Sequence, residues 1–466
     1  MELKFLGAAG TVTGSCYLLT TSRHTLLLDC GQIQGNRAEE EGNRAPLPVP
    51  LERIDAVVLS HAHIDHSGRL PLLHSQGYDG PIYTHDATRA LCEIMLYDSA
   101  YLHEKDAEWE NRKRRRKGLA TIEPLYTRGD AERVMGQFRS LAYDERREIL
   151  PGIEVRLRDA GHILGAAIVE LWIEDGGERR KLVFSGDLGF RESPVMEDPA
   201  YVEDADVVLL ESTYGDRNHR SLESTLEELR TIFEAADDTG GNVLIPAFAV
   251  GRTQDLLYLM TQHFDEWQLG RWRIFLDSPM AIEATSIYAA YRHLYRADLF
   301  RDGRWPRLPN FTATRTSEES MALNEIESGA IIIAGSGMCT GGRILHHLKH
   351  NVWRPECHVV IVGFQAHGTL GRKLVDKAPH IRLWQEAIKV NATVHTVGGL
   401  SAHADQSGLL EWYGRFNARP PVWLVHGEDK ARAALADKLR EEYGVTARRP
   451  VPNDVVDLAG GRAGAA

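Results

Sequence analysis

Short apolar runs separated by polar turns recur along the chain and predict a mixed α/β fold. The runs 56–59, 182–184 and 207–210 are rich in Val, Leu and Phe, as buried strands are, and helical spacing of apolar residues follows several such runs. Many of the predicted strands lead directly into a histidine or a carboxylate. These residues are Asp29, His61, His63, His162, Asp187, Glu211, His403 and His426. Because ligands collect beyond the carboxyl ends of strands in open α/β sheets, we expect these side chains to converge.

The pattern changes after Glu211. Four successive units of apolar run, small-residue loop and helical periodicity begin at "NVLIPAF", "RIFLDSP", "GAIIIAGSG" and "HVVIVGF". Repeated units of this kind are typical of a compact parallel α/β domain. We therefore predict that residues 212–393 form a domain inserted into a first fold, whose two parts are residues 1–211 and 394–466.

Composition limits the setting of the protein. The chain has 466 residues and five scattered cysteines without a C-x-x-C pair, which argues against a disulfide framework and against a cysteine-based zinc finger. No segment approaches the roughly 18 apolar residues of a membrane span, and the N-terminus lacks the apolar core of a signal peptide. These features favour a cytoplasmic protein that does not enter a membrane. The net charge of −12 disfavours polyanion binding over the whole surface, so nucleic acid needs a local basic groove.

The most basic segment is "NRKRRRKG" at 111–118, which follows the acidic stretch 104–110. Glu108 stands four residues before Arg112, and Glu110 four residues before Arg114, a spacing that favours ion pairs on a solvated helix. The alternative is a patch that follows phosphates, since residues 114–117 have little acid beside them. The sequence leaves both interpretations open.

The segment "SHAHIDHSG", residues 60–68, concentrates donors for a metal ion. Alternate side chains of an extended segment share one side, so His61 and His63 can face the same ion. Asp65 and His66 lie where the next segment begins a helix, and they can reach a second position. Imidazole and carboxylate are donors that zinc accepts. A polar loop satisfied by backbone and water is the alternative, but this density of donors directly after a strand favours a centre for two metals.

The order of these motifs resembles that of the metallo-β-lactamase fold, and in particular its nucleic-acid-processing β-CASP branch. Asp29, "HAHIDH", His162 and Asp187 resemble the first four motifs of the fold, in that order. "ESTYGDR" from Glu211, "SAHAD" with His403 and "LVHGE" with His426 resemble motifs A, B and C of the branch. The resemblance extends over almost the whole chain, and seven motifs in order make it specific. It implies an α/β protein: an αββα sandwich with an inserted parallel β-CASP domain. Similar proteins include bacterial and archaeal ribonucleases and the cleaving subunit of the eukaryotic pre-mRNA 3′-end processing complex.

The resemblance also implies a role for each motif residue. One zinc ion would be held by His61, His63, His162 and Asp187, and the second by Asp65, His66, Asp187 and His426. The two Zn²⁺ ions would share Asp187, and such a pair can hold a hydroxide at neutral pH because it lowers the pKa of water to about 7. His403 is then the expected general acid, oriented and kept protonated by Glu211. Asp29 is expected to hold the loop from His61 to His66 in place without binding metal itself.

Two glycine-containing loops of the inserted segment are candidates for substrate contact. The loop "GSGMCTGGR" at 335–343 could also be interpreted as a dinucleotide-binding site. Its glycine spacing is not G-x-G-x-x-G, however, so no nucleotide cofactor is expected. Glycines let backbone N–H groups approach a phosphate, and a tight strand-to-helix turn is the alternative interpretation. The resemblance implies RNA backbone contacts at Ser336, Gly337, Thr369 and Arg372. His367 departs from many relatives, in which an acidic residue precedes G-T-L-G-R.

Together these features predict a zinc-dependent endoribonuclease that hydrolyses single-stranded RNA and leaves 5′-phosphate and 3′-hydroxyl ends. The alternatives are a 5′ to 3′ exoribonuclease with the same metals, a small-molecule ester or thioester hydrolase of the same fold, and a non-catalytic RNA-processing subunit. A simple esterase leaves Glu211, His403 and His426 without a role, and a non-catalytic subunit is expected to have lost ligands. The resemblance further implies a homodimer formed through the inserted domain.

Overall fold

Residues 1–191, 193–296, 308–366 and 368–458 are described in a computed structural model of the chain, apart from the side chain of Arg37. They belong to two compact units. The first contains Met1–Arg191, Asp198–Asn218 and His403–Ala466, and the second contains Glu192–Glu197 and His219–Ala402. The domain limits expected from the sequence, after residues 211 and 393, stay predictions. His367 lies outside the described residues.

A mixed β-sheet opens the first unit. In spatial order its strands are β21 (Val455–Asp457), β1 (Glu2–Gly7), β2 (Cys16–Thr20), β3 (Thr25–Leu28), β4 (Ala56–Val58), β5 (Ile82–His85) and β6 (Phe138–Leu141). Strands β3 to β6 run parallel, whereas β21, β1, β2 and β3 pair antiparallel. Nearly every residue of β2, β3 and β4 is buried, as is typical of strands covered on both faces.

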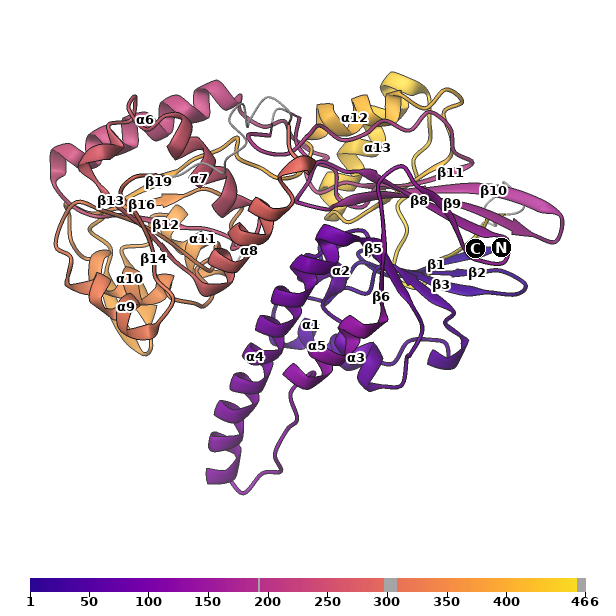
Figure 1. The fold of residues 1–466 in the computed structure, drawn as a ribbon, viewed down its shortest axis with the longest axis horizontal. Coiled ribbons are helices and arrows are strands. Elements are labelled where there is room, and N and C mark those ends of the chain that lie inside the picture. The colour runs from indigo at the N-terminus through magenta and orange to yellow at the C-terminus, as the bar shows by residue number, and fades with distance from the viewer. Residues whose placement is uncertain (192, 297–307, 367, 459–466) are drawn as a thin grey trace. The chain divides into compact units, whose positions relative to one another are not determined.

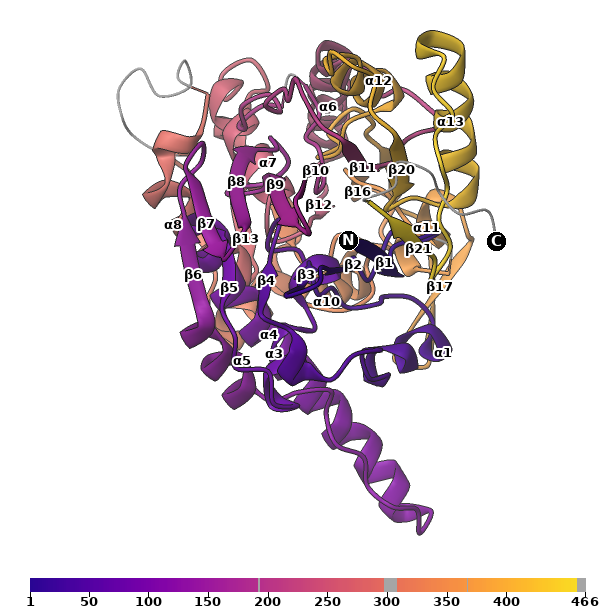
Figure 2. The same ribbon diagram turned by 90° about the vertical axis from the view of Figure 1, so that its right-hand side faces the viewer.

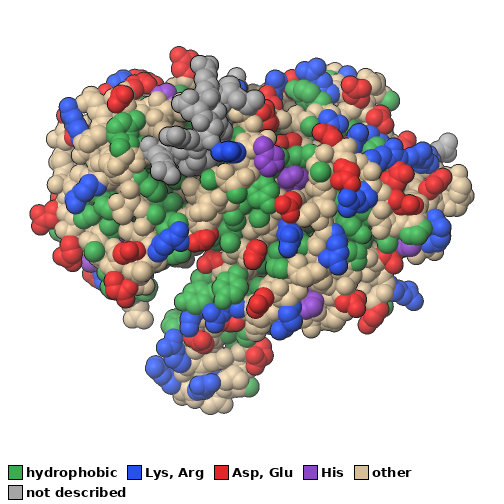
Figure 3. Space-filling model, in the orientation of Figure 1, with side chains coloured by type: hydrophobic (Ala, Val, Ile, Leu, Met, Phe, Trp, Pro, Cys, Tyr) green, Lys and Arg blue, Asp and Glu red, His purple; other side chains and the backbone are tan. Residues whose placement is uncertain are grey.

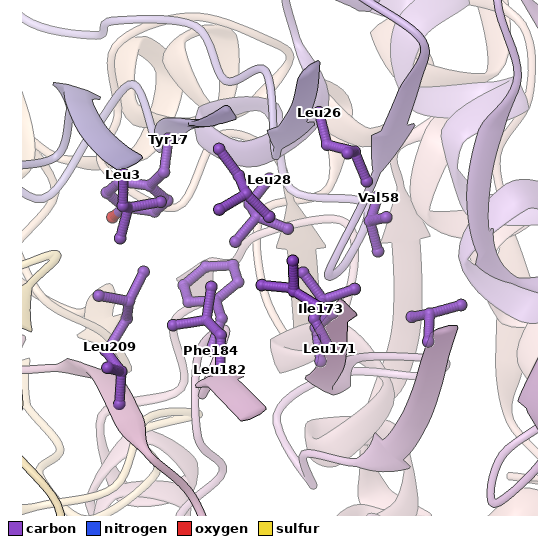
Figure 4. Packing of buried hydrophobic residues seen from close by; sticks show 14 of the residues in the cluster. Leu3, Tyr17, Leu26, Leu28, Val58, Leu171, Ile173, Leu182, Phe184 and Leu209 are labelled. Atoms are coloured by element: carbon purple, nitrogen blue, oxygen red, sulfur yellow. The ribbon is translucent and has the colours of Figure 1, made fainter. Parts of the chain in front are cut away.

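A second sheet packs against the first. In spatial order its strands are β20 (Val422–Val425), β11 (Val207–Glu211), β10 (Glu178–Phe184), β9 (Ala167–Asp175), β8 (Ile153–Asp159) and β7 (Arg146–Leu150). Figure 4 shows Tyr17 and Leu28 of the first sheet facing Phe184 and Leu171 of the second. The rings of Tyr17 and Phe184 meet edge-on, with centroids 5.3 Å apart, which is a favoured aromatic geometry. Apolar burial between the sheets therefore holds the sandwich together.

Helices cover the outer faces of both sheets (Figures 1 and 2). The α-helices of the first unit are α1 (Arg37–Glu40), α2 (Ile64–Ser67), α3 (Leu70–Ser75), α4 (Asp86–Arg116), α5 (Arg128–Val134), α12 (Gln406–Gly414) and α13 (Asp429–Tyr443). Helices α3, α4 and α5 pack together on the side of β5 and β6, whereas α12 and α13 lie together on the side of β20. The first unit is therefore the αββα sandwich that the family resemblance implies.

Parallel strands form the centre of the second unit. In spatial order they are β14 (Phe311–Ala313), β13 (Arg273–Asp277), β15 (Ala330–Ala334), β12 (Val243–Pro246), β16 (His358–Ile361) and β19 (Thr393–Thr396), and each neighbouring pair is parallel. The helices are α6 (Leu222–Thr239), α7 (Arg252–Gln262), α8 (Pro279–Ala290), α9 (Ser317–Ala322), α10 (Ile344–Asn351) and α11 (Leu370–Val375). A hairpin of β17 (His380–Leu383) and β18 (Glu386–Lys389) completes the unit. The predicted parallel α/β architecture is confirmed.

All five cysteines are free and buried. None of the helices in the described residues is both long enough and apolar enough to cross a membrane.

Candidate metal centre

The predicted site residues of the first unit lie at strand ends, in α2 or just before α12. Asp29 follows β3, His61 and His63 follow β4, Asp65 and His66 lie in α2, His162 follows β8, Asp187 follows β10, Glu211 ends β11, His403 precedes α12, and His426 follows β20. Both sheets therefore contribute to one cluster at one end of the sandwich. The loop after β3 approaches the ligand loop so closely that a Cβ at Gly31 would lie 1.6 Å from the Asp65 carbonyl oxygen, which explains glycine there.

The first donor group consists of His61, His63, His162 and Asp187. The Nδ1 atom of His63 lies 3.2 Å from His61 Nε2 and 3.1 Å from His162 Nε2. The Oδ2 atom of Asp187 lies 3.5 Å from His61 Nε2 and 3.7 Å from His162 Nε2. Three imidazoles and one carboxylate thus present their donor atoms to a common point.

The second donor group consists of Asp65, His66 and His426. Their donor atoms also converge, with His66 Nε2 3.1 Å and Asp65 Oδ2 3.5 Å from His426 Nε2. Asp187 reaches this group as well as the first, because its Oδ2 lies 3.3 Å from His66 Nε2 and its Oδ1 lies 3.5 Å from His426 Nδ1. One carboxylate therefore lies between two sets of metal donors.

The donor atoms of each group have a spacing that fits zinc. Zinc binds nitrogen at about 2.0–2.1 Å in a tetrahedron, so neighbouring donors should lie roughly 3.3 Å apart, which is close to the spacings here. The Oδ1 atom of Asp187 is buried and accepts no hydrogen bond in the described residues, although a buried carboxylate oxygen ordinarily has a partner. Burial lowers the pKa of His61 well below its usual value and that of His63 to about 4, so both imidazoles are neutral and can ligate a cation.

Asp29 forms hydrogen bonds with the loop of residues 60–68. Its carboxylate is fully buried and accepts from the Ser60 backbone N–H at 2.8 Å and from the hydroxyls of Ser60 and Ser15 at 3.0 and 2.9 Å. It also accepts from His66 Nδ1 at 2.7 Å. This bond orients the His66 ring and turns its Nε2 toward the second donor group. The sequence analysis did not identify Ser15 and Ser60 as partners of Asp29. The only available signal was the position of Ser60 directly before His61.

His403 lies beside Glu211 at the edge of the cluster. Its Nδ1 atom is 3.3 Å from Glu211 Oε1 and 3.9 Å from Asp187 Oδ2. Backbone N–H groups of Leu188 and Thr213 donate to the two oxygens of Glu211, at 2.9 and 3.1 Å, and so fix its orientation. Burial lowers the pKa of His403, but Glu211 and Asp187 outweigh this effect and raise the pKa to about 9.

The four predicted RNA-contact residues lie in the second unit. Ser336 and Gly337 belong to the loop between β15 and α10, and Thr369 and Arg372 belong to the start of α11. A backbone hydrogen bond of 3.1 Å from Gly371 to Met338 joins the two loops. Thr369 caps α11, accepting from the Arg372 N–H at 3.2 Å, and the Arg372 guanidinium pairs with Asp376 at 3.0 Å. The structure therefore brings these four residues into two adjoining loops, and their contact with RNA stays a prediction.

A buried network that the sequence did not indicate anchors the first of these loops. The Asp277 carboxylate accepts from His347 Nε2 at 2.6 Å, from the hydroxyls of Ser320 and Thr314 at 2.6 and 2.5 Å, and from Arg343 at 2.7 Å. Burial raises the pKa of Asp277, but these four donors hold it well below its usual value. Arg343 ends the loop 335–343, so the network fixes where α10 begins. Its members are far apart in sequence, and each one alone resembles an ordinary polar residue.

Comparison with known proteins identifies the family. Residues 9–239 match the metallo-beta-lactamase superfamily, residues 253–374 the Beta-Casp domain, and residues 387–450 the Zn-dependent metallo-hydrolase RNA specificity domain. Ribonuclease TTHA0252 of Thermus thermophilus is 40% identical over 94% of this chain and 96% of its own length. The chain belongs to the metallo-β-lactamase β-CASP ribonuclease family. It is therefore a metal-dependent hydrolase, and the predicted resemblance is confirmed.

Other relatives carry a different name. Transcription termination factor FttA of Methanosarcina mazei is 31% identical over 95% of this chain and 69% of its own length. The protein of that name from Pyrococcus abyssi is 34% identical over 87% of this chain and 62% of its own length. A crystal structure of a protein of unknown function from Enterococcus faecalis V583 has a TM-score of 0.51 at 13% identity, covers 98% of this chain and 99% of its own, and shares the fold.

Proposed function

We propose that the protein is a zinc-dependent endoribonuclease that hydrolyses single-stranded RNA and leaves 5′-phosphate and 3′-hydroxyl ends. The observation that carries this proposal is the convergence of two donor groups on Asp187, beside a histidine that contacts Glu211. The names of the relatives, a ribonuclease and a transcription termination factor, support RNA as the substrate. The donor set supports zinc, and the shared carboxylate supports two ions.

The ligands divide between the two ions as the donor groups do. His61, His63, His162 and Asp187 would hold one zinc ion, and Asp65, His66, His426 and Asp187 the other. When bound, such a pair acidifies water to a pKa of about 7 and neutralises charge on the phosphoryl oxygens. The chain keeps Asp187 ionised for this role, because His426 and His66 outweigh the effect of burial and hold its pKa well below the usual value.

The leaving group requires a proton from the chain. Hydrolysis forms a bond between phosphorus and a water oxygen and breaks the bond between phosphorus and the 3′ oxygen of the upstream nucleotide. His403 would donate the proton to that oxygen, since a pKa of about 9 keeps its imidazole charged at neutral pH. Glu211 would act through His403 by orienting its ring and stabilising its charge.

The two loops of the second unit would hold the RNA backbone. Gly337 leaves its backbone open where a Cβ would lie 2.7 Å from the Phe248 ring. Arg372 can exchange its exposed pair with Asp376 for an RNA phosphate, because surface ion pairs are weak. We therefore propose phosphate contacts at Ser336, Gly337, Thr369 and Arg372.

Cleavage of labelled RNA tests the proposal. Zinc-loaded protein is incubated with internally labelled and with 5′-end-labelled single-stranded RNA, beside the Asp187→Asn and His403→Ala variants. We expect internal fragments with 5′ phosphates from the wild type, and a loss of cleavage in both variants. Equal cleavage by the wild type and Asp187→Asn would refute the proposal.

The same assay distinguishes the alternatives. Release of mononucleotides from the 5′ end, without internal fragments, would indicate a 5′ to 3′ exoribonuclease with the same ligands. Hydrolysis of small esters but not of RNA would indicate a small-molecule hydrolase, and metal binding without any hydrolysis a non-catalytic subunit. Pairing of two copies through the second unit is part of the proposal, and the mass of the protein in solution tests it.

A further inference from the structure

Helix α4 carries exposed aromatic and basic side chains that the proposed reaction does not use. Tyr97, Tyr101, Lys105, Trp109 and Lys113 follow one another at four-residue spacing, and we call them the α4 stripe. Residues four apart are neighbours on a helix surface, and the sixteen-residue span corresponds to about 24 Å along the axis. The aromatic members are 48%, 42% and 55% exposed in chain order. Aromatic side chains usually bury more of their surface, so the stripe has the character of a binding surface.

Cations lie over the faces of these rings. The ammonium group of Lys113 lies 2.9 Å from the centroid of the Trp109 ring, and that of Lys105 lies 5.7 Å from the centroid of Tyr101. Arg128, at the start of α5, lies 5.9 and 5.7 Å from the centroids of Tyr97 and Tyr101. Rings and cations are therefore neighbours along this surface, which winds gradually round the helix because four residues exceed one turn. Figure 3 shows hydrophobic and basic side chains close together on the part of the molecule that projects at the bottom of the view.

The basic end of α4 differs from the helix expected from the sequence. The predicted pairs Glu108–Arg112 and Glu110–Arg114 are wrong, because Glu108 pairs with Lys105 at 2.9 Å and Arg114 donates to the Ala120 carbonyl at 2.5 Å. Within the described part of the chain, no ion pair involves Arg112, Lys113, Arg115, Arg116 or Lys117. The helix dipole favours cations at this end, but it does not neutralise five of them.

The surface is also built to hold its shape. Asn111 and Ile122 exchange two hydrogen bonds, of 2.8 and 2.7 Å, which tie the returning chain to the helix. Glu104 accepts from the backbone N–H and the guanidinium of Arg128, at 2.9 and 2.8 Å, and so fixes the cation above the tyrosines. A groove of about 560 Å³ runs between α4 and this returning segment, and its charged lining residues are Arg112 and Arg115 together with Glu104, Glu108 and Glu123. The backbone that carries these side chains is therefore held in place before a ligand binds.

We propose that the α4 stripe and the basic end of α4 bind single-stranded RNA outside the metal centre. Bases would stack on Tyr97, Tyr101 and Trp109, and Arg112, Lys113 and Arg116 would contact phosphates. Aromatic platforms combined with a basic track are what proteins use to hold single strands without a sequence preference. The charges favour RNA over a protein partner, because protein interfaces are depleted in Lys, and because the cations at the end of α4 that form no ion pair within the described residues attract a polyanion. This inference rests on the proposed function, because the RNA that binds here would be the substrate of the metal centre.

Binding of RNA by the full chain in the Asp187→Asn background, where the strand stays uncut, tests this surface. Fluorescence anisotropy is measured with single-stranded RNA of about 5 and about 30 nucleotides, a range that spans the usual site sizes of such proteins. One variant combines Tyr101→Ala with Trp109→Ala, and a second combines Arg112→Gln, Lys113→Gln and Arg116→Gln. The controls are Trp384→Ala, at an equally exposed tryptophan of the second unit, and Arg271→Gln with Lys438→Gln and Arg440→Gln, which removes the same charge elsewhere.

The long RNA should lose affinity and the short RNA should not. Loss of two stacking rings should weaken binding of the long RNA by at least about 10-fold, and Tyr101→Phe with Trp109→Phe should restore it. The charge variant should reduce the slope of log affinity against log salt by about 2, since each phosphate contact in a single strand contributes about 0.7. The controls should match the parent protein, and melting temperatures should be unchanged.

Two outcomes would overturn the inference. If the stripe variants bind the long RNA as tightly as the controls do, with the same salt slope, the stripe does not bind RNA and is left as a surface for a protein partner. If control and stripe variants lose affinity equally, the effect is one of net charge alone. Cleavage of the short RNA by the wild type is measured in parallel, and its absence would count against the proposed function instead.

Discussion

Replacing Asp29 with asparagine removes one charge from beneath the metal ligands and keeps the shape of the side chain. The Asp29 backbone has a positive φ of 58°, a conformation that asparagine adopts as readily as aspartate. The substitution therefore changes the hydrogen-bonding pattern without straining the turn after β3. Its effect on metal binding measures what the buried carboxylate contributes.

The size of the effect follows from the four hydrogen bonds that Asp29 accepts. The hydroxyls of Ser15 and Ser60 can rotate, but the Ser60 N–H and the His66 Nδ1–H are fixed donors on different carboxylate oxygens. An asparagine amide leaves one of these donors facing its NH₂ group. An unsatisfied buried donor costs about 1–3 kcal/mol, and each 1.4 kcal/mol is a factor of ten in affinity. Asp29→Asn should therefore weaken zinc binding by about 10- to 100-fold, as is usual for groups that hold metal-binding histidines.

Competition with a chromophoric chelator measures the zinc affinity directly. Asp277→Asn is the matched control, because Asp277 is equally buried in the second unit and also accepts from a histidine and a serine hydroxyl. The control should lose stability but keep its zinc affinity. Unchanged zinc affinity in Asp29→Asn, or an equal loss in Asp277→Asn, would refute the role given to Asp29.

Three further predictions concern proton transfer and pH. His403→Ala should slow single-turnover RNA cleavage by about 10²- to 10⁴-fold while bound zinc stays the same by mass spectrometry; loss of zinc would make His403 a ligand. Glu211→Gln should lower the pKa of His403, which acts when protonated, so the alkaline limb of the pH–rate profile should move to lower pH; an unmoved limb would contradict the pairing. Burial lowers the pKa of His358 to about 4, and its Nδ1 atom lies 2.9 Å from Nε2 of His395. The free energy of unfolding, measured in urea, should therefore be constant above about pH 6.5 and fall as the pH is lowered toward 4. His358→Gln should reduce this dependence on pH, and an equal dependence in the variant and the wild type would refute the prediction.

Much of the site could be predicted because its signals are local. The spacing of His61, His63, Asp65 and His66 places donors on both sides of one loop, and strand ends carry the remaining ligands. The residues that hold this loop were not visible in the same way. Ser15 contacts Asp29 only because β2 and β3 pair antiparallel, a pairing that the residue pattern leaves undetermined.

The fold shows the same limit. Apolar runs located most strands, but an apolar run does not say which sheet it joins. Strand β19 leads toward His403, yet it pairs with β16 and completes the parallel sheet of the second unit. On α4, residue spacing predicted ion pairs that do not form, because Glu108 reaches Lys105 three residues back instead of Arg112 four residues on. Side-chain direction and competition between partners decide such details.

The most direct test of the central claim is the anomalous scattering of a crystal of the zinc-loaded protein at the zinc edge. We expect two peaks, one among His61, His63 and His162 and the other among Asp65, His66 and His426, with Asp187 in contact with both. A single peak, or a second peak without His426 beside it, would contradict the two-metal centre.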